Sequence, residues 1–435
     1  MVRRDLRGEN RRTSRLASRC SAPAGWVGSW ELGLGITSKI PVLCSRKLHR
    51  LRFVADKRTC YIRRSLTATE AEHCVKLSNF LFPESREPAL DERVIDETIQ
   101  EARLTEQLGF DAVWLAEHHF DGICAYVDPI SFAAALATAT SRIKIGFAVA
   151  QVSLHHPIRL AEQISLLDNI TKGRIIAGLG RGTAYNIYDY QGYGVPAEQA
   201  QERFEESEAI MLKAWSGEPV EHHGKYWNLK LPMLRPRPYT RPHPIIIRSC
   251  GTEESLLGIA RKRRPFMMNV QSLDVTKRRM DLYRQTLRAQ GMTDTEVTRL
   301  LEDCWVWRNV FVAHTDAEAE RVGVPLFQEM QKQRAAMRER VFKEQGVRLQ
   351  SHAPGPTAPA ARTVVEHALL HGSPATVAEK LAAIDAIGVG GLIMSFRLGP
   401  MPHELATSSL RLFAEKVMPQ MRMKGARVMH RGEET

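Results

Sequence analysis

The sequence predicts an α/β fold, a closed (β/α)8 TIM barrel with insertion loops that follows a basic N-terminal extension. Two observations support this prediction. Strand-like and helix-like segments alternate from about Val75 onward, and eight strand–helix units fit before residue 418 with one long insertion. Alternation of this kind is typical of a parallel sheet, and eight units favour a closed barrel. An open, doubly wound sheet stays the alternative.

Short apolar segments bounded by Gly, Pro or polar residues predict the strands. They cover residues 76–82, 111–116, 142–150, 174–179, 245–249, 266–270, 305–313 and 391–396. Apolar residues at helical spacing predict helices over residues 91–108, 129–139, 156–170, 199–215, 253–261, 273–290, 317–350, 376–387 and 404–418. We expect a loop or hairpin over residues 217–244 and a flexible segment over residues 351–361.

The net charge of +12 is concentrated at the N-terminus. Residues 1–74 contain 16 Lys and Arg against 6 Asp and Glu, a net of +10, so the remainder carries only +2. A nucleic-acid surface on the folded body is therefore not expected. We divide the chain into an extension (1–74), a barrel (75–425) and a short charged tail (426–435).

The extension is Arg-rich and has no sustained helix or strand period. We expect it to be disordered, or a spurious addition to a protein whose translation starts at Val75. A targeting or regulatory segment and a folded segment stay open as alternatives, but a secretory signal would need an apolar core and a small-residue cleavage site.

Four of the seven cysteines lie in the extension, and the other three, Cys124, Cys250 and Cys304, are widely spaced. This spacing makes neither a disulfide framework nor a zinc ribbon, which is typical of a reducing cytoplasm. The sequence has no apolar run of about 18 residues, so no transmembrane helix is expected.

The first candidate site is Glu117-His118-His119, which directly follows the apolar segment 111–116. Active sites of such barrels lie at the carboxyl ends of the strands, and imidazole can relay protons or bind metals. Side chains alternate along a strand, so Glu117 and His119 share one side and His118 faces the other. We predict a catalytic or cofactor-binding role and no metal. A structural cap and a metal site formed by Glu117 and His119 are the alternatives.

The second candidate site is the glycine-spaced turn around Gly180-Arg181-Gly182. Glycines let backbone approach an anion, and Arg181 offers a bidentate cation. The turn matches neither the dinucleotide fingerprint nor the Walker loop. Arg203 could bind the same anion as Arg181, or pair with Glu206 on its own helix.

The third candidate site is Ser249-Cys250-Gly251-Thr252, between a predicted strand and a predicted helix. Free N–H groups at a helix start bind anions. Ordinary N-capping by Thr252 is the alternative.

Several motifs, taken in order, resemble the luciferase-like flavin monooxygenases. The resemblance runs from about Val75 to Met418 and rests on Val75–Phe82, Gly109–Phe120, His156–Glu162, Leu166-Leu167-Asp168, Lys172-Gly173-Arg174 and Gly180-Arg181-Gly182. It implies a barrel that binds reduced FMN as a co-substrate, forms a flavin hydroperoxide with oxygen and oxygenates a small organic substrate.

The resemblance also implies roles for single residues. His118 matches the catalytic histidine, with Glu117 and His119 beside it in the motif. Arg181 and Arg203 match arginines on the flavin phosphate, and a cis peptide packed near the flavin ring is implied at Ala148-Val149. The remaining residues that it places at the cofactor are Gly180, Ser249, Gly251, Thr252 and Ser255.

The expected partners follow from the same resemblance. The sequence has no NAD(P)H fingerprint, so we expect a separate NAD(P)H-dependent flavin reductase. We also expect a homodimer in the cytoplasm. Gly180 stands where the light-emitting subunit has a cysteine, so oxygenation is favoured over light emission. The alternatives are an oxidoreductase that uses the deazaflavin F420, a non-catalytic flavin-binding barrel, and a metal-dependent hydrolase.

Overall fold

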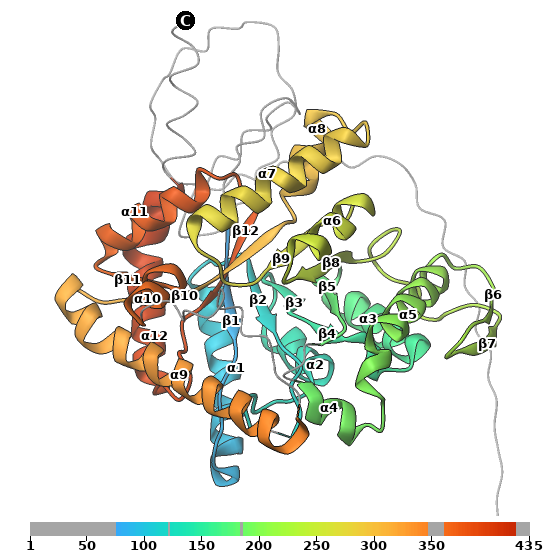
Figure 1. Cartoon of the computed structure of the whole chain (residues 1–435), viewed down its shortest axis with the longest axis horizontal. Coiled ribbons are helices and arrows are strands. Elements are labelled where there is room, and N and C mark those ends of the chain that lie inside the picture. Colours follow the sequence, from blue (N-terminus) through green and yellow to red (C-terminus); the bar gives the residue numbers. More distant parts are fainter. Residues whose placement is uncertain (1–74, 121, 183–185, 347–360, 423–435) are drawn as a thin grey trace, which may run out of the picture. The chain divides into compact units, whose positions relative to one another are not determined.

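Eight parallel strands form a closed barrel in the computed structural model, which describes residues 75–120, 122–182, 186–346 and 361–422 (Figure 1). This confirms the predicted fold class. In the order in which they pair, the barrel strands are β1 (Lys76–Leu81), β2 (Ala112–Leu115), β3 (Lys144–Phe147), β5 (Ile175–Gly180), β8 (Ile245–Cys250), β9 (Phe266–Met268), β10 (Trp305–Val312) and β12 (Gly391–Ser395).

Two pairings complete the barrel, one between the first and last strands of the sequence and one between consecutive strands. β1 pairs with β12, with Lys76 opposite Gly391, and β9 pairs with β10, with Met267 opposite Trp305. All the barrel pairings are parallel. The carboxyl ends of the strands therefore meet at one end of the barrel, which we call the mouth.

The strand predicted over residues 142–150 is divided in two. β3 ends at Phe147, and β4 (Ala150–Gln151) resumes the pairing with β5 after the Ala148–Val149 peptide bond, which is cis as the resemblance implied. An additional strand, β11 (Leu369–Gly372), pairs with the last residues of β10 and was not predicted.

Helices surround the sheet, and nine of them were predicted (Figure 1). They are α1 (Asp91–Gln107), α2 (Pro129–Ala139), α3 (Pro157–Thr171), α5 (Ala200–Trp215), α6 (Glu253–Arg261), α7 (Leu273–Ala289), α9 (Asp316–Gln345), α11 (Pro374–Asp385) and α12 (His403–Leu412). α12 continues into a π-helical turn, Phe413–Val417. The predicted excursion contains an antiparallel hairpin of β6 (Val220–His223) and β7 (Asn228–Leu231).

Three short helices escaped prediction: α4 (Ile187–Gly192), α8 (Asp294–Leu301) and α10 (Ala361–Ala368). For α8 the signal was present, because Thr293 and Glu296 form a capping box at its start. The extension (1–74), the tail (426–435) and all but the last residue of the segment predicted to be flexible (351–361) lie outside the described residues.

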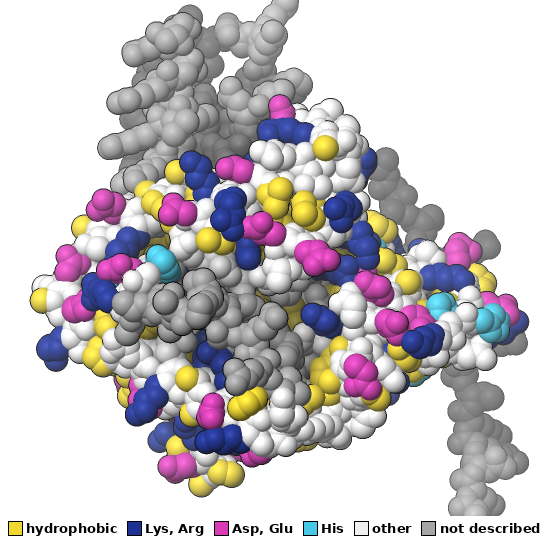
Figure 2. All heavy atoms as spheres, viewed as in Figure 1, with side chains coloured by type: hydrophobic (Ala, Val, Ile, Leu, Met, Phe, Trp, Pro, Cys, Tyr) yellow, Lys and Arg dark blue, Asp and Glu magenta, His cyan; other side chains and the backbone are white. Residues whose placement is uncertain are grey.

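The mixed surface charge agrees with the prediction of a near-neutral body. Acidic and basic side chains are interspersed over the face in Figure 2. Cys124, Cys250 and Cys304 are buried and are not joined in disulfides. None of the helices in the described ranges is long and apolar enough to cross a bilayer.

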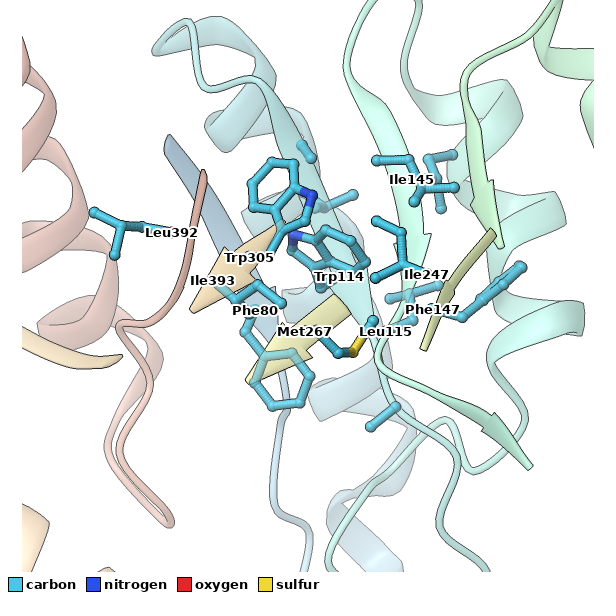
Figure 3. Packing of buried hydrophobic residues seen from close by; sticks show 14 of the residues in the cluster. Phe80, Trp114, Leu115, Ile145, Phe147, Ile247, Met267, Trp305, Leu392 and Ile393 are labelled. Carbon is cyan, nitrogen blue, oxygen red and sulfur yellow. The ribbon is translucent and has the colours of Figure 1, made fainter. Parts of the chain in front are cut away.

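Two tryptophans fill the barrel interior (Figure 3). The rings of Trp114 and Trp305 meet edge to face with centroids 5.0 Å apart. The Trp114 indole N–H donates to the Ser78 hydroxyl at 2.9 Å, which satisfies its buried donor. Gly146 on the neighbouring strand makes room, because a Cβ there would lie 2.5 Å from the Trp114 ring.

Replacement of Gly146 by Ala should lower the free energy of unfolding by about 2 kcal/mol, since the added methyl overpacks a filled interior. Gly258→Ala is the matched control, because its Cβ would meet nothing within 4 Å and alanine favours a helix. Urea unfolding of both variants tests this. Equal stabilities of Gly146→Ala and the wild type would contradict the packing.

Candidate active site

Just after β2, at the mouth, neighbouring side chains point in opposite directions. His118 packs against Phe82, just past the end of β1, with ring centroids 5.3 Å apart. His119 instead places Nε2 3.1 Å from Glu117 Oε1. The predicted alternation is therefore confirmed. Glu117 and His119 share one side of the strand end, and His118 faces the opposite side.

Glu117 is a buried carboxylate with three protein partners. His155 Nε2 lies 2.8 Å from Oε1, which His119 also contacts. The backbone N–H of Gln151 donates to Oε2 at 2.6 Å. Both carboxylate oxygens are therefore hydrogen-bonded inside the protein, as a buried charge requires.

These contacts decide the protonation of the cluster. Burial raises the pKa of Glu117, but the His155 charge and the hydrogen bonds outweigh it and lower that pKa to about 2. Burial opposes charge on His119 and His155 as well, yet the Glu117 carboxylate raises the pKa of each. The cluster of Glu117, His119 and His155 therefore carries both signs of charge below neutral pH.

Asp189 ties α4 to the end of β2. The His119 N–H donates to Asp189 Oδ1 at 3.1 Å. The side-chain amides of Gln151 and Asn186 both donate to Oδ2, at 2.6 and 2.8 Å. Burial raises the pKa of Asp189, although these hydrogen bonds oppose the shift.

His118 is in a different electrostatic state from its neighbours. Its Nδ1 lies 3.3 Å from Asn186 Nδ2. Burial, followed by the positive charge of Arg334, lowers the pKa of His118 to about 4. His118 is therefore neutral at physiological pH, whereas the same strand end holds a charged cluster on its other side.

Helix α9 runs beside the mouth and brings Arg334 toward His118. Gln333, the preceding residue, accepts a hydrogen bond from Arg86 in the segment that follows β1. At its C-terminal end, α9 contacts α4, where Gln191 Nε2 donates to Gln345 Oε1 at 2.6 Å. The helix thus connects two sides of the mouth (Figure 1).

The two predicted arginines lie in different surroundings. Arg181 directly follows β5 and is exposed. Its backbone carbonyl accepts a hydrogen bond from the Tyr190 hydroxyl. Arg203, in the first turn of α5, donates to Gln199 Oε1 at 3.0 Å and lies 4.7 Å over the Tyr226 ring. The alternative that pairs Arg203 with Glu206 is wrong, because Glu206 is hydrogen-bonded to His222 and to the backbone of the hairpin loop.

The third predicted segment lies at the start of α6. Thr252 is the N-cap, and its hydroxyl and that of Ser255 form a capping box. Ser249 is exposed, and Gly251 is half-buried next to the cap. The N-capping alternative is therefore confirmed, while anion binding at the same turn stays a prediction.

The Ala148–Val149 segment packs closely against glycines of β5. A Cβ on Gly178 would lie 1.6 Å from the Phe147 carbonyl oxygen, and one on Gly180 would lie 2.5 Å from Val149 Cγ2. Only glycine permits this close approach. The segment is thereby held beside the glycine-spaced turn, as a cofactor wall would require.

One hollow of about 330 Å³ lies at the amino ends of the strands, and another of about 480 Å³ lies between α6 and α7. Neither borders Glu117 or His118. Across the described ranges, no three His, Cys, Asp or Glu side chains are arranged to hold a metal ion.

Sequence reasoning missed several residues of the network, namely Gln151, His155, Asn186, Asp189 and Arg334. Gln151 and His155 follow the third predicted strand, so their position near the mouth was a readable signal. Asn186 and Asp189 belong to a short helix that was not predicted, and Arg334 lies in a charged helix without a local motif.

Comparison with known proteins identifies the family. The sequence model of the luciferase-like monooxygenases matches residues 75–390. The chain belongs to this family, which confirms the resemblance.

One relative is the oxygenase component of the flavin-dependent trigonelline monooxygenase of Acinetobacter baylyi. It is 29% identical over 154 residues, which are 35% of this chain and 42% of that protein. The chain spans about two fifths of the length of the first curated relatives that it matches.

Solved structures share the barrel over most of the chain. The monooxygenase RslO1 of Streptomyces bottropensis has a TM-score of 0.66 and 26% identity, covering 79% of this chain and 99% of that one. Two others are below 25% identity and show the fold alone. They are the oxygenating constituent of 3,6-diketocamphane monooxygenase from a Pseudomonas putida plasmid, in complex with FMN (TM-score 0.63, 24% identity, 80% and 98% covered), and an F420-dependent secondary alcohol dehydrogenase (0.59, 15%, 80% and 99%).

The charged cluster should make stability depend on pH in a defined window. Glu117→Gln should lower the free energy of unfolding by about 3 kcal/mol near pH 6, because it removes one partner of a buried ion pair. A lowered carboxyl pKa contributes stability above the unfolded value of 4.5, which is lost toward pH 2. Raised histidine pKa values contribute below 6.5, and their contribution is lost as pH rises through the folded values.

Urea unfolding of wild type and Glu117→Gln between pH 3 and pH 9 measures this difference, with the exposed Glu254→Gln as control. The difference should be largest between pH 4.5 and 6.5. A difference that is constant across the series would show that Glu117 acts through packing alone.

Proposed function

We propose that this protein is the oxygenase component of a two-component flavin-dependent monooxygenase. It uses reduced FMN and O2 to oxygenate a small organic substrate, and a separate NAD(P)H-dependent reductase supplies the reduced flavin. Family membership and the relative named as an oxygenase component support the proposal. The observation that carries it is the neutral His118 at the mouth, beside a buried charged cluster.

His118 can donate one specific proton. The Asn186 amide nitrogen can only donate, so His118 Nδ1 accepts and the ring proton resides on Nε2. The orientation of the amide is supported by its second donation to Asp189. His118 Nε2–H is then available to a reacting group, and the ring stays neutral down to about pH 4. Proton donation at this atom is the acid–base role we assign to His118.

The cluster of Glu117, His119 and His155 positions that proton. Because Glu117 is hydrogen-bonded on both oxygens, the end of β2 is held in one conformation. Glu117 and His119 therefore act as positioning residues for His118. Phe82 presents an apolar ring against His118, which keeps water from part of the imidazole.

The residues at the mouth fit a flavin. The segment of Ala148 and Val149, packed flush on Gly180, offers an apolar wall for a planar ring. The first turn of α6, which directly follows Gly251 and Thr252, offers N–H groups to a phosphate. Ser249, Ser255, Arg181 and Arg203 are the other residues we assign to the cofactor. Reduced FMN, when bound, supplies the electrons that activate O2, so that one oxygen atom enters the substrate and the other leaves as water.

The homodimer and the cytoplasmic location stay predictions. Leu166 and Ile170 support the first, because they lie one turn apart on α3 and are 51% and 46% exposed. Apolar side chains that share an exposed helix face favour an interface.

The proposal is tested by cofactor titration and by turnover. Purified protein is titrated with FMN and with F420, and product formation is then screened with a purified flavin reductase, NADH and a panel of small substrates. FMN should bind, and His118→Gln should lower oxygenated product at least 100-fold, the loss typical of a missing acid–base group, with FMN affinity retained. His367→Gln, an exposed histidine on α10, is the control.

Three outcomes would contradict the proposal. Exclusive binding of F420 would replace FMN as the cofactor. Tight FMN binding without any turnover of the panel would favour a flavin-binding barrel without catalysis. Full activity of His118→Gln would remove His118 from the reaction.

A further inference from the structure

Arg279, in the second turn of α7, is a buried cation with incomplete hydrogen bonding. Its side chain is only 9% exposed, and its Nη2 donates to the Gly251 carbonyl oxygen at 3.2 Å. Its Nε and Nη1 are buried and have no hydrogen-bond partner among the described residues, and no described carboxylate pairs with it. A buried cation in this state is costly unless an anion binds to it.

The register of α7 separates Arg279 from its neighbour. Thr276, Arg279, Met280 and Tyr283 are buried on the face toward the sheet. Arg278 lies on the outer side, where its Nη2 is 2.6 Å from Glu253 Oε1. Glu253 is therefore already paired with an exposed arginine, and Arg279 extends inward beside the turn that precedes α6.

The guanidinium of Arg279 reaches the start of α6. Gly251, its acceptor, directly precedes the N-cap Thr252. The N–H groups in the first turn of a helix, together with the helix dipole, favour an anion there. An inward arginine and a helix N-terminus thus converge on one turn at the mouth.

A second buried arginine adds to the positive charge on this side. Arg308 of β10 is 2% exposed, and its Nη2 donates to the Thr276 hydroxyl at 2.9 Å, one turn before Arg279. Burial lowers its pKa to about 10, so it remains charged at neutral pH. No carboxylate in the described part of the chain forms an ion pair with Arg308.

We propose that Arg279 is a phosphate-binding residue for the flavin, contributed by α7 and acting together with the turn at Gly251 and Thr252. This inference rests on the proposed function. It adds a cation that the sequence motifs did not indicate. Arg203, by contrast, has its guanidinium stacked on Tyr226 and its Nε bonded to Gln199.

Binding of FMN and of riboflavin tests the assignment, because the two differ by the phosphate alone. Each flavin is titrated into the full chain, and quenching of flavin fluorescence gives Kd. The variants are Arg279→Met and Arg279→Gln, which remove the charge, and the matched control is Lys277→Met, two residues away and exposed on the same helix. Thermal unfolding followed by circular dichroism checks that each variant folds.

Wild type should bind FMN more tightly than riboflavin. Arg279→Met and Arg279→Gln should each weaken FMN binding about 10- to 100-fold, as expected for the loss of a charged hydrogen bond. Riboflavin affinity should be unchanged. Lys277→Met should bind both flavins like the wild type.

The outcomes separate the two proposals. If wild type prefers FMN and a folded Arg279 variant keeps that preference, the inference about Arg279 is overturned and the proposed function stands. If wild type binds FMN and riboflavin equally, no phosphate site exists, and both the inference and the FMN assignment are overturned. Arg279→Gln, which keeps polarity, decides the result if Arg279→Met does not fold.

Discussion

The Glu117 carboxylate is buried, and the segments around the mouth are arranged to satisfy its charge. His155, which precedes α3, and Gln151 of β4 both contact it, and His119, shortly after β2, contacts the same oxygen as His155. Three parts of the chain are thereby held against one carboxylate. The free energy of burying it is offset only while all these hydrogen bonds are intact.

The position of His118 is a consequence of this arrangement. Strand alternation turns His118 away from the ions that surround Glu117, toward Phe82 and Asn186. Burial and Arg334 then lower its pKa, while the same carboxylate raises the pKa of His119. Two adjacent histidines thus hold opposite protonation states near pH 6 because they face different surroundings.

The barrel and the position of Glu117-His118-His119 at its mouth could be predicted from local sequence, because strand periodicity and position at a strand end are local properties. The cis peptide followed from the family resemblance. The partners Asn186 and Asp189 could not, since they reach His118 and His119 from about 70 residues away through a short helix. The role of Arg279 could not be predicted for a similar reason. The sequence of α7 predicts an amphipathic helix, and only the packing shows that this arginine faces inward beside Gly251.

Nitrogen-15 NMR of the histidine rings tests the central claim most directly, with His118 assigned by comparison with a His118→Gln sample. At pH 7 the ring of His118 should be neutral with its proton on Nε2, and it should stay neutral until the pH falls to about 4. His119 and His155 should lose their protons only above 6.5. A His118 ring that carries its proton on Nδ1, or that titrates near 6.5, would contradict the account.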